Sequence, residues 1–342
     1  MVMRSGARQG QRSRMFRSSA LLTKWSLLTV LIVTGQFSQL AWSGDKSAAQ
    51  WVDEMSRAFK DRNYHGKFMY WSGKQINTLE ILHKVKDGEE FERIRRLSGK
   101  QVDVIRADHP LFCLHPADHF ARLEDGGAFA AKFREGKSGF VKSYTLSVGI
   151  LGKVAGRPAQ QIIVTAQDRL RYDYELWLDQ ESAFLLKSAL LGPDGAPLEV
   201  FEFVDLQLGI ELADSLFELA THTQASPAGH AGHGHDRSKA ASDWHVTWAP
   251  QGFTLASRDV QNDSEGLSPM DVMMYADGLA TYTVFVEGVS VGQALAETVS
   301  QEGATIAFSQ PMVQSDAYWV TVVGELPLDT IKRIASSVSK KH

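Results

Sequence analysis

The residues Gly288-Val-Ser-Val-Gly292 match the G-x-S-x-G pattern in which a serine acts as the nucleophile of a hydrolase. In the chain order of such a triad, only His342 follows Ser290 to serve as the base. The segment before the motif alternates polar and apolar side chains, whereas the strand before a nucleophile elbow is buried on both faces. We therefore interpret Ser290 as the N-cap of a helix over 290–300, with a serine esterase as the alternative.

Four histidines could supply metal ligands within the polar segment 220–243: His222, His230, His233 and His235. That segment has no periodic apolar face and fixes no ligand geometry. It is typical of a linker that spans about 27 Å as a coil. We predict a plain linker without a specific metal site, with metal binding by these histidines as the alternative, and we expect weak adventitious zinc or nickel binding in either case.

The single cysteine excludes an intramolecular disulfide. Cys113 stands in the apolar run 111–114, which indicates a buried thiol with a raised pKa rather than a nucleophile. The sequence also lacks an H-E-x-x-H motif, a P-loop and a G-x-G-x-x-G opening a helix. The sequence therefore predicts a binding protein that is not an enzyme and needs no cofactor.

Residues 1–43 have the three parts of a secretory signal peptide. A basic stretch precedes the nine-residue apolar run 25–33, and Ala41-Trp42-Ser43 supplies small residues for cleavage after Ser43. A retained membrane anchor is the alternative, but spanning a bilayer takes roughly 20 apolar residues. We expect an exported chain, which in the absence of disulfides fits a bacterial periplasm.

The exported part is acidic. The first 44 residues carry six basic residues and no acidic one, which leaves 30 of the 36 basic residues against 40 acidic residues. Affinity for nucleic acid depends largely on neutralised phosphates. We therefore expect no nucleic-acid partner.

The sequence patterns after the predicted signal peptide indicate a first domain over residues 45–219. Ser47 and Gln50 form a capping box, and Trp51, Met55 and Phe59 recur on one face of a helix. Alternating segments with short turns then predict an antiparallel sheet. The predicted strands are 64–71, 78–85, 91–97, 102–107, 111–114, 160–166, 170–179, 184–191 and 198–206.

Residues 124–156 interrupt this pattern with glycines and aromatic residues. We interpret them as a long irregular segment, because such segments are often functional. In the strand 170–179, Leu170, Tyr172 and Tyr174 are predicted to face one way and Arg171 the other. The first domain is thus predicted to be a curved antiparallel sheet with helices against its concave apolar side.

A smaller α+β domain is predicted over 244–342. Strands are expected over 244–257, 271–275, 280–286 and 318–323, with a tight turn at Ala276-Asp-Gly-Leu279. Helices are expected over 290–300 and 328–338, where apolar residues recur at helical spacing. The fold class is therefore α+β throughout.

Several segments, taken in order and spacing, resemble the MucB/RseB family of periplasmic regulators of the sigma-E envelope-stress pathway. The resemblance covers about 48–339. It depends on segments 151–158, 174–179, 191–195, 201–203, 248–253, 275–279, 322–327 and 332–335.

This resemblance implies an unclosed half-barrel like that of the periplasmic lipoprotein carriers. It also implies that the protein binds the periplasmic segment of a membrane-spanning anti-sigma factor and shields it from the first regulatory protease. Lipoprotein or lipopolysaccharide would act as the signal that releases it. A lipid or lipoprotein carrier is the alternative, although it gives the second domain no role. The sequence does not decide whether the chain forms a homo-oligomer.

Aromatic residues are the candidates for both binding sites. For a lipid site within the half-barrel they are Phe68, Tyr70, Tyr172 and Tyr174, with Trp177 if the opposite face lines it. Aromatic residues are frequent hot spots of protein interfaces, which also suggests a partner site in the second domain. Its candidates are Trp248, Phe253, Tyr275 and Phe285. The lipid-site candidates are equally consistent with plain core positions, and for the four residues of the small second domain we favour core positions.

Overall fold

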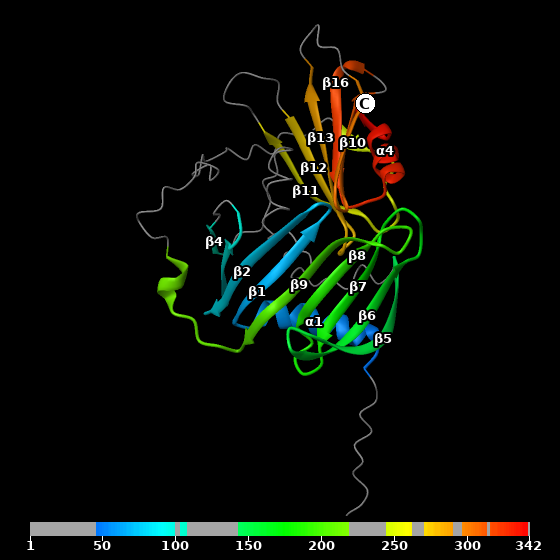
Figure 1. The fold of residues 1–342 in the computed structure, drawn as a ribbon. Helices are drawn as coiled ribbons and strands as arrows, with labels where there is room; N and C mark the ends of the chain where they lie inside the picture. The colour runs from blue at the N-terminus through cyan, green and yellow to red at the C-terminus, as the bar shows by residue number, and fades with distance from the viewer. Residues whose placement is uncertain are drawn as a thin grey trace, which may run out of the picture. The chain divides into compact units, whose positions relative to one another are not determined.

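The computed structural model describes residues 46–99, 103–107, 143–218, 244–261, 270–289, 296–312 and 315–340. Residues 46–342 form one compact unit. It contains a nine-stranded and a six-stranded antiparallel sheet, which we call the first sheet and the second sheet (Figure 1).

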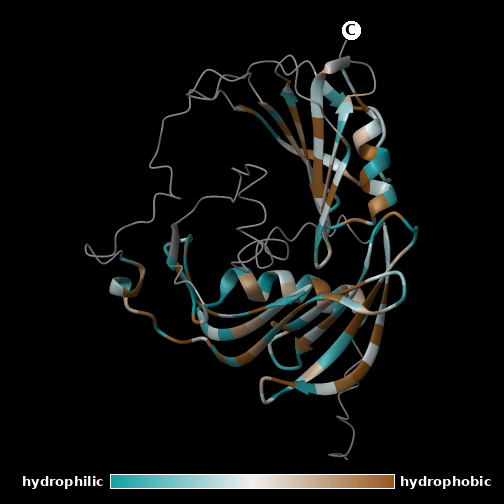
Figure 2. Ribbon diagram, turned by 45° about the horizontal axis from the view of Figure 1, so that its top comes forward, coloured by the Kyte–Doolittle hydropathy of each residue, from teal (hydrophilic) through white to brown (hydrophobic). Residues whose placement is uncertain are grey.

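Helix α1 (Ala48–Asp61) begins where the capping box predicted it. Ser47 Oγ accepts a hydrogen bond from the Gln50 backbone at 3.3 Å, and the Gln50 side chain accepts one from the Ser47 backbone at 2.8 Å. Trp51, Met55 and Phe59 are buried in the core of the first sheet. Side chains of this size each contribute roughly 1.5–3 kcal/mol when buried. Figure 2 shows the first sheet curving around this helix.

The first sheet has the strand order β4-β3-β2-β1-β9-β8-β7-β6-β5, so β4 and β5 are its two edges and it does not close. Its strands are β1 (Tyr64–Ser72), β2 (Gln75–Lys86), β3 (Glu89–Arg96), β4 (Asp103–Ala107), β5 (Tyr144–Val154), β6 (Arg157–Ala166), β7 (Asp173–Asp179), β8 (Leu185–Leu191) and β9 (Pro197–Leu208). Together with α1, this arrangement confirms the predicted fold class of the first domain.

The register of the sheet follows from its tight turns and its alternating side chains. The β2–β3 turn places Asp87 and Gly88 at φ of 55° and 86°, the left-handed conformation of a two-residue hairpin turn. Along β7 the buried residues Tyr174, Leu176 and Leu178 alternate with partly exposed neighbours. The prediction that one face of this strand is apolar is confirmed.

Strand β5 lies where we predicted an irregular segment, so that prediction is wrong for residues 144–154. As an edge strand β5 exposes Ile150 and Leu151, and it therefore lacks the alternation of its neighbours. A Cβ at Gly152 would overlap the ring of Trp177 on β7, which lies two strands away in the sheet. This glycine reflects close packing rather than a loop. Residues 108–142, including Cys113 and the predicted strand 111–114, lie outside the described residues.

The second sheet has the order β11-β12-β13-β16-β15-β14. Its strands are β11 (Thr254–Gln261), β12 (Met270–Ala276), β13 (Thr281–Gly288), β14 (Thr298–Glu302), β15 (Thr305–Met312) and β16 (Ser315–Gly324). Helix α4 (Leu328–Ser336) contacts β15 and β16 and buries Ile331, Ile334 and Ala335 in the core of this sheet. A separate pair joins β10 (Trp244–Val246) to β17 (Val338–Lys340).

Two predictions for this region are wrong. The strand expected over 244–257 is two strands in different sheets, because Gly252 at φ +94° turns the chain between β10 and β11. The helix expected over 290–300 is contradicted at Thr298–Ser300, which pair with β15 and leave Val299 exposed. Residues 290–295, including Ser290, lie outside the described residues.

The segment after β9 is fixed to the first sheet by charged groups. A short 3-10 helix, η2 (Asp214–Phe217), places Asp214 against Lys84 and Lys86 of β2, and the Lys86 contact is 2.8 Å long. Lys84 Nζ also donates to the carbonyl oxygen of Leu212 at 2.6 Å. No helix in the described part of the chain is long and apolar enough to cross a membrane.

Candidate functional site: the junction of the two sheets

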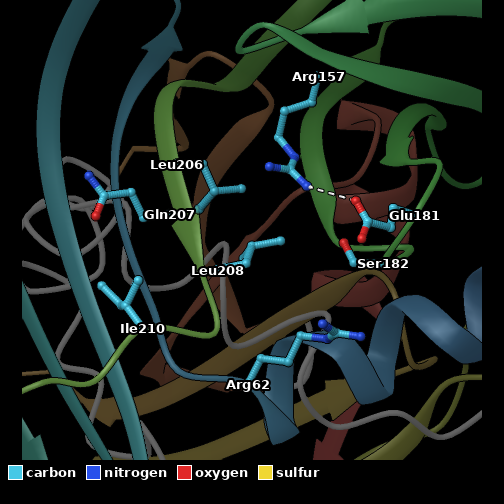
Figure 3. Close-up of a pocket in the computed structure, with 8 residues that line it drawn as sticks. All are labelled: Arg62, Arg157, Glu181, Ser182, Leu206, Gln207, Leu208 and Ile210. Carbon is cyan, nitrogen blue, oxygen red and sulfur yellow. Dashed lines mark ion pairs between the residues drawn. The ribbon is translucent and has the colours of Figure 1, made fainter.

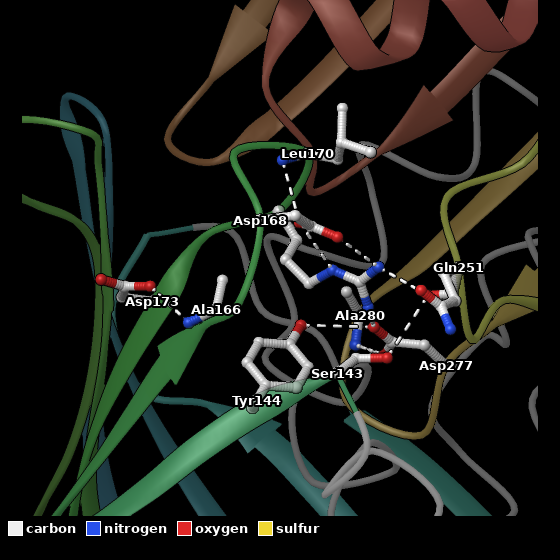
Figure 4. Close-up of polar contacts among 10 residues, drawn as sticks. Ser143, Tyr144, Ala166, Asp168, Leu170, Asp173, Gln251, Asp277 and Ala280 are labelled. Carbon is white, nitrogen blue, oxygen red and sulfur yellow. Dashed lines mark hydrogen bonds and ion pairs between the residues drawn. The ribbon is translucent and has the colours of Figure 1, made fainter.

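A buried guanidinium connects the first sheet to the second. Arg171, just before β7, donates from Nη1 to Asp277 Oδ2 at 2.5 Å and from Nη2 to the Gln251 carbonyl oxygen at 2.7 Å. Asp277 follows β12 and Gln251 precedes β11, so both partners belong to turns of the second sheet. Asp168 accepts two further hydrogen bonds from Arg171, at 3.2 and 3.1 Å (Figure 4). The side chains of Arg171 and Asp277 are both 0% exposed.

Asp277 also organises its own turn. Its Oδ1 accepts the backbone N–H groups of Leu279 and Ala280 at 2.9 and 2.8 Å. Its Oδ2 accepts the Tyr144 hydroxyl from β5 at 3.3 Å. A buried charge is tolerated only when it is paired and its remaining hydrogen-bonding capacity is satisfied. Asp277 meets this condition by combining a turn of the second sheet with two residues of the first.

The electrostatics of this contact favour a permanent ion pair. Burial opposes the charge of Arg171, but the hydrogen bond to Asp168 and nearby acidic groups outweigh it and raise the pKa of Arg171 above its ordinary value. Burial, followed by the nearby Tyr174 and Asp277, raises the pKa of Tyr144 well above its ordinary value. The guanidinium therefore stays charged and the phenol stays protonated near neutral pH, as a structural contact requires.

A buried carboxylate makes a second contact between the sheets. Glu199 on β9 accepts the Tyr70 hydroxyl at 2.8 Å and the Ala304 backbone N–H, from the β14–β15 turn, at 3.0 Å. Ser72 Oγ donates to the same carboxylate at 3.4 Å. Gly303 has φ +57°, and a Cβ there would overlap Ser72 Oγ and lie 2.9 Å from Glu199 Cγ. Only glycine fits at this turn without displacing the contact.

Two turns of the second sheet also contribute to the core of the first. Leu279 and Ala304 are 2% and 0% exposed, and they belong to the apolar cluster that contains α1 and the inward side chains of the first sheet. We call these two turns, residues 277–280 and 303–305, the plug. The plug covers a part of the first sheet's apolar interior that would otherwise be open.

The predicted lipid-site residues lie in this interior, apart from Trp177. Phe68, Tyr70, Tyr172 and Tyr174 are all buried, and the rings of Phe68 and Phe201 lie 4.7 Å apart. Burial, with the nearby charge of Glu199, raises the pKa of Tyr172 to about 12.

Trp177 lies on the opposite face of β7 and donates from Nε1 to Glu175 Oε1 at 2.6 Å. The junction brings Tyr70 together with Glu199 and lies beside Tyr174. A lipid role for these residues stays a prediction.

The predicted partner-site residues lie apart from one another. Phe253 and Tyr275 are buried in the core of the second sheet, where Phe253 also lies 5.2 Å from the Arg171 guanidinium. Phe285 is buried on the other face of the same sheet, in a small cluster with two valines. Trp248 is partly exposed, and the Arg333 guanidinium stacks on its ring at 3.8 Å. Of the four, Trp248 is therefore the residue best placed for contact with another molecule.

A pocket of about 440 Å³ lies at the C-terminal end of β9, opposite to the end that carries Glu199 (Figure 3). It is lined by Arg62, Arg157, Glu181, Ser182, Leu206, Gln207, Leu208 and Ile210. Arg157 is already engaged by two hydrogen bonds to Asp179, at 2.8 and 3.1 Å. Burial opposes the negative charge of Asp179. The hydrogen bonds from Arg157 and Ser182 outweigh this effect and hold the pKa of Asp179 below its ordinary value. None of the predicted site residues lines the pocket.

The described residues contain no group of three or more His, Cys, Asp or Glu side chains that could hold a metal ion. Ser290 and the four linker histidines lie outside the described residues, so the esterase and metal alternatives stay predictions.

Sequence reasoning missed the residues that join the sheets. Arg171 was assigned to the outward face of its strand, and it does face away from Tyr172, but the second sheet buries it. The inward position of Glu199 could be inferred from the sequence, because Glu199 lies on the same face of its strand as Phe201 and Phe203. A carboxylate in an apolar row indicates a buried partner. Asp277 was placed in a turn without a partner, since sequence spacing does not show which turns meet.

The fold and the junction define a two-domain α+β protein whose buried polar contacts hold two antiparallel sheets together. Models of two protein-family domains match the chain: the MucB/RseB N-terminal domain over residues 47–221 and the MucB/RseB C-terminal domain over 238–339. The chain belongs to the MucB/RseB family.

Named relatives are regulatory proteins. The chain is 31% identical to the sigma factor AlgU regulatory protein MucB of Pseudomonas aeruginosa, over 91% of this chain and 96% of that protein. It is 29% identical to the sigma-E factor regulatory protein RseB of Haemophilus influenzae, over 91% and 96% of the two chains. A crystal structure of MucB in complex with MucA(peri) matches with a TM-score of 0.69 and 30% identity, over 86% of this chain and 99% of that one.

Proposed function

We propose that this protein is a periplasmic negative regulator of a sigma factor. It binds the periplasmic segment of a membrane-spanning anti-sigma factor and shields that segment from the first regulatory protease. Lipoprotein or lipopolysaccharide releases it. In this proposal residues 1–43 are a cleaved signal peptide, and residues 44–342 act in the periplasm without catalysing a reaction.

The observation that carries this proposal is the similarity to MucB solved together with MucA. It extends over 99% of the MucB chain at 30% identity, so the similarity includes both sheets and not the first sheet alone. A second structure of the Pseudomonas aeruginosa MucA/MucB complex matches with a TM-score of 0.70. A protein that used only its first sheet as a lipid carrier would leave the second sheet without a role.

The geometry supports Trp248 as part of the partner surface. Tryptophan and arginine are enriched at interface hot spots. Here Trp248, between β10 and β11, stacks with Arg333 of α4, and both side chains are at least partly exposed. Phe253, Tyr275 and Phe285 are buried, so they would support the partner surface through the fold. The inward aromatic residues of the first sheet, Phe68, Tyr70, Tyr172 and Tyr174, would receive the acyl chain of the signal.

A proteolysis assay tests the shielding role. The periplasmic segment of the cognate anti-sigma factor is incubated with the first regulatory protease, with and without residues 44–342, and with and without lipopolysaccharide. We expect protection by the protein and loss of protection when lipopolysaccharide is added. Equal cleavage with and without well-folded protein would contradict the shielding proposal.

Trp248→Ala tests the surface. We expect a loss in affinity of at least about 2 kcal/mol, the size of a hot-spot effect. Because Trp248 also packs against the core of the second sheet, thermal stability falls as well, and a native circular dichroism spectrum at the assay temperature shows that the fold is kept. Trp177→Ala is the matched control, because Trp177 is also partly exposed but lies on the first sheet. If both variants bind the partner segment as the wild type does, Trp248 is not part of the contact surface.

A further inference from the structure

The plug fills space inside the first sheet that an apolar ligand would need. Leu279 and Ala304 pack in the same cluster as Phe68 and Tyr174, and all four side chains are 2% exposed or less. Protein interiors are close-packed, so an acyl chain cannot enter such a cluster without displacing something. The two turns of the plug are the groups most easily displaced, because only two sets of polar contacts hold them to the first sheet.

We propose that the docked plug is an autoinhibitory element: a single acyl chain enters the first sheet by displacing residues 277–280 and 303–305, which breaks the Arg171–Asp277 and Glu199–Ala304 contacts and separates the two sheets. This inference rests on the proposed function and names the conformational change by which a lipid signal acts. The occupant is an acyl chain because the interior is lined by phenylalanine, tyrosine and leucine side chains.

Unsatisfied polar atoms show that the docked state carries an internal cost. The hydroxyl groups of Tyr174 on the first sheet and Thr305 in the plug are buried without a hydrogen-bond partner within the described part of the chain. Buried polar groups that lack partners destabilise the state that contains them. Separation of the sheets would give both hydroxyl groups access to water, which offsets part of the loss of the junction contacts.

The linkage to partner binding follows from the two states. A ligand shifts an equilibrium only by its differential affinity for the two forms. An acyl chain binds only the separated form, since the plug occupies its place in the docked form. If the anti-sigma segment binds the docked form more tightly, lipid and partner oppose each other without sharing a surface, and the effect is reciprocal.

The amide of Ala304 is a direct reporter of sheet separation, because its N–H donates across the junction to Glu199. Hydrogen–deuterium exchange of residues 44–342 is measured with and without 1-palmitoyl lysophosphatidylglycerol below its micelle concentration. Hydrogen bonds to charged groups have strengths that correspond to roughly ten- to a hundredfold in an equilibrium constant. We expect the probe to accelerate exchange at Ala304 by at least about tenfold, while amides between β1 and β2 stay unchanged.

Asp277→Asn weakens the contact with little change in shape, and Asp53→Asn is its matched control. Asp53 pairs with Arg57 on the exposed face of α1, with both side chains more than 60% exposed. We expect Asp277→Asn to lower the probe concentration for half-maximal exchange by about tenfold and Asp53→Asn to leave it unchanged. Glu199→Gln, at the second contact, should act in the same direction if Asp277→Asn does not fold.

The outcomes separate this inference from the proposed function. Probe binding, followed by tryptophan fluorescence, with unchanged or slower exchange at Ala304 would overturn the inference. So would the absence of probe binding to both the wild type and Asp277→Asn. Calorimetry with the anti-sigma segment in the absence of lipid tests the proposed function separately. A chain that binds the segment but fails the exchange test keeps its function and loses this mechanism.

Discussion

Replacing Asp277 with asparagine removes one charge from a fully buried ion pair. Asparagine keeps the Oδ1 acceptor for the Leu279 and Ala280 amides, so the turn itself is preserved. Arg171 then keeps one carboxylate partner, the partly exposed Asp168, and the carbonyl oxygen of Gln251, and it faces a side-chain amide in place of Asp277 Oδ2. Breaking a buried pair by removing one partner typically costs about 3–5 kcal/mol. Because Asp168 remains, we expect the lower end, about 3 kcal/mol.

Urea unfolding followed by circular dichroism measures this loss. Asp53→Asn, at an exposed pair on α1, should cost less than about 0.5 kcal/mol. The double variant Arg171→Met, Asp277→Asn removes the uncompensated charge as well, and it should recover at least about 1 kcal/mol relative to Asp277→Asn. A slope of unfolding free energy with urea that stays constant among the variants makes the comparison valid.

An Asp277→Asn variant that loses no more stability than Asp53→Asn would contradict a stabilising role for the buried pair. That result would mean that the guanidinium reaches water when its partner is removed, and that the junction does not contribute to the folded state as the burial of both side chains requires. A double variant less stable than Asp277→Asn would contradict the charge-based explanation and favour a packing role for the Arg171 side chain.

Three further predictions concern single positions. Gly303→Ala should destabilise the chain at least about 1 kcal/mol more than Gly195→Ala, because both have φ between +57° and +77° but only Gly303 lacks space for a Cβ; thermal melts of the two decide. Tyr70→Phe should lower the free energy of unfolding by about 1.5–3 kcal/mol, because it removes a hydrogen bond to the Glu199 carboxylate. Tyr174→Phe should change it by less than about 0.5 kcal/mol, because the Tyr174 hydroxyl has no hydrogen-bond partner among the described residues. Equal losses of the two variants in urea unfolding would contradict this. Hydrogen bonds from two lysines of β2 lower the pKa of Asp214 to about 2, below its ordinary 3.8, so its contribution to stability is full above pH 4 and is lost as the pH falls through 2; a carboxyl titration by NMR with a midpoint near 3.8 would disprove the contact.

Local sequence patterns predicted the elements whose cause is local. Helix α1 begins at Ser47 because both halves of the capping box lie within four residues, and its buried face follows from helical spacing. The β2–β3 hairpin depends on two adjacent residues that adopt left-handed conformations. In each case the sequence contains the whole physical reason for the structure.

The predictions that failed depended on distant residues. In the sequence, Gly149 and Gly152 favour a loop at β5. In the structure they make room for the side chains of Gln161 on the adjacent β6 and of Trp177 on β7, two strands away. Thr298–Ser300 carries an apolar residue that fits a helical stripe, but the pairing of this segment with β15 decides its structure. A short segment with few apolar residues does not distinguish helix from strand without knowledge of its neighbours.

The junction could be predicted only in part, for the same reason. The inward position of Glu199 was visible in its strand, but its partner Ala304 is 105 residues away. Arg171 and Asp277 are separated by 106 residues, and nothing in their local sequence pairs them. The family resemblance extended over both sheets, yet it did not indicate which turns of the second sheet meet the first.

The central claim is that this chain binds an anti-sigma factor and that lipid opposes that binding. Calorimetric titration of residues 44–342 with the periplasmic segment of the cognate anti-sigma factor, with and without lipopolysaccharide, tests it most directly. The account predicts saturable one-site binding that weakens at least about tenfold when lipopolysaccharide is present, as expected for a coupling free energy above about 1.4 kcal/mol. Absence of binding by well-folded protein, or binding that lipopolysaccharide leaves unchanged, would contradict it.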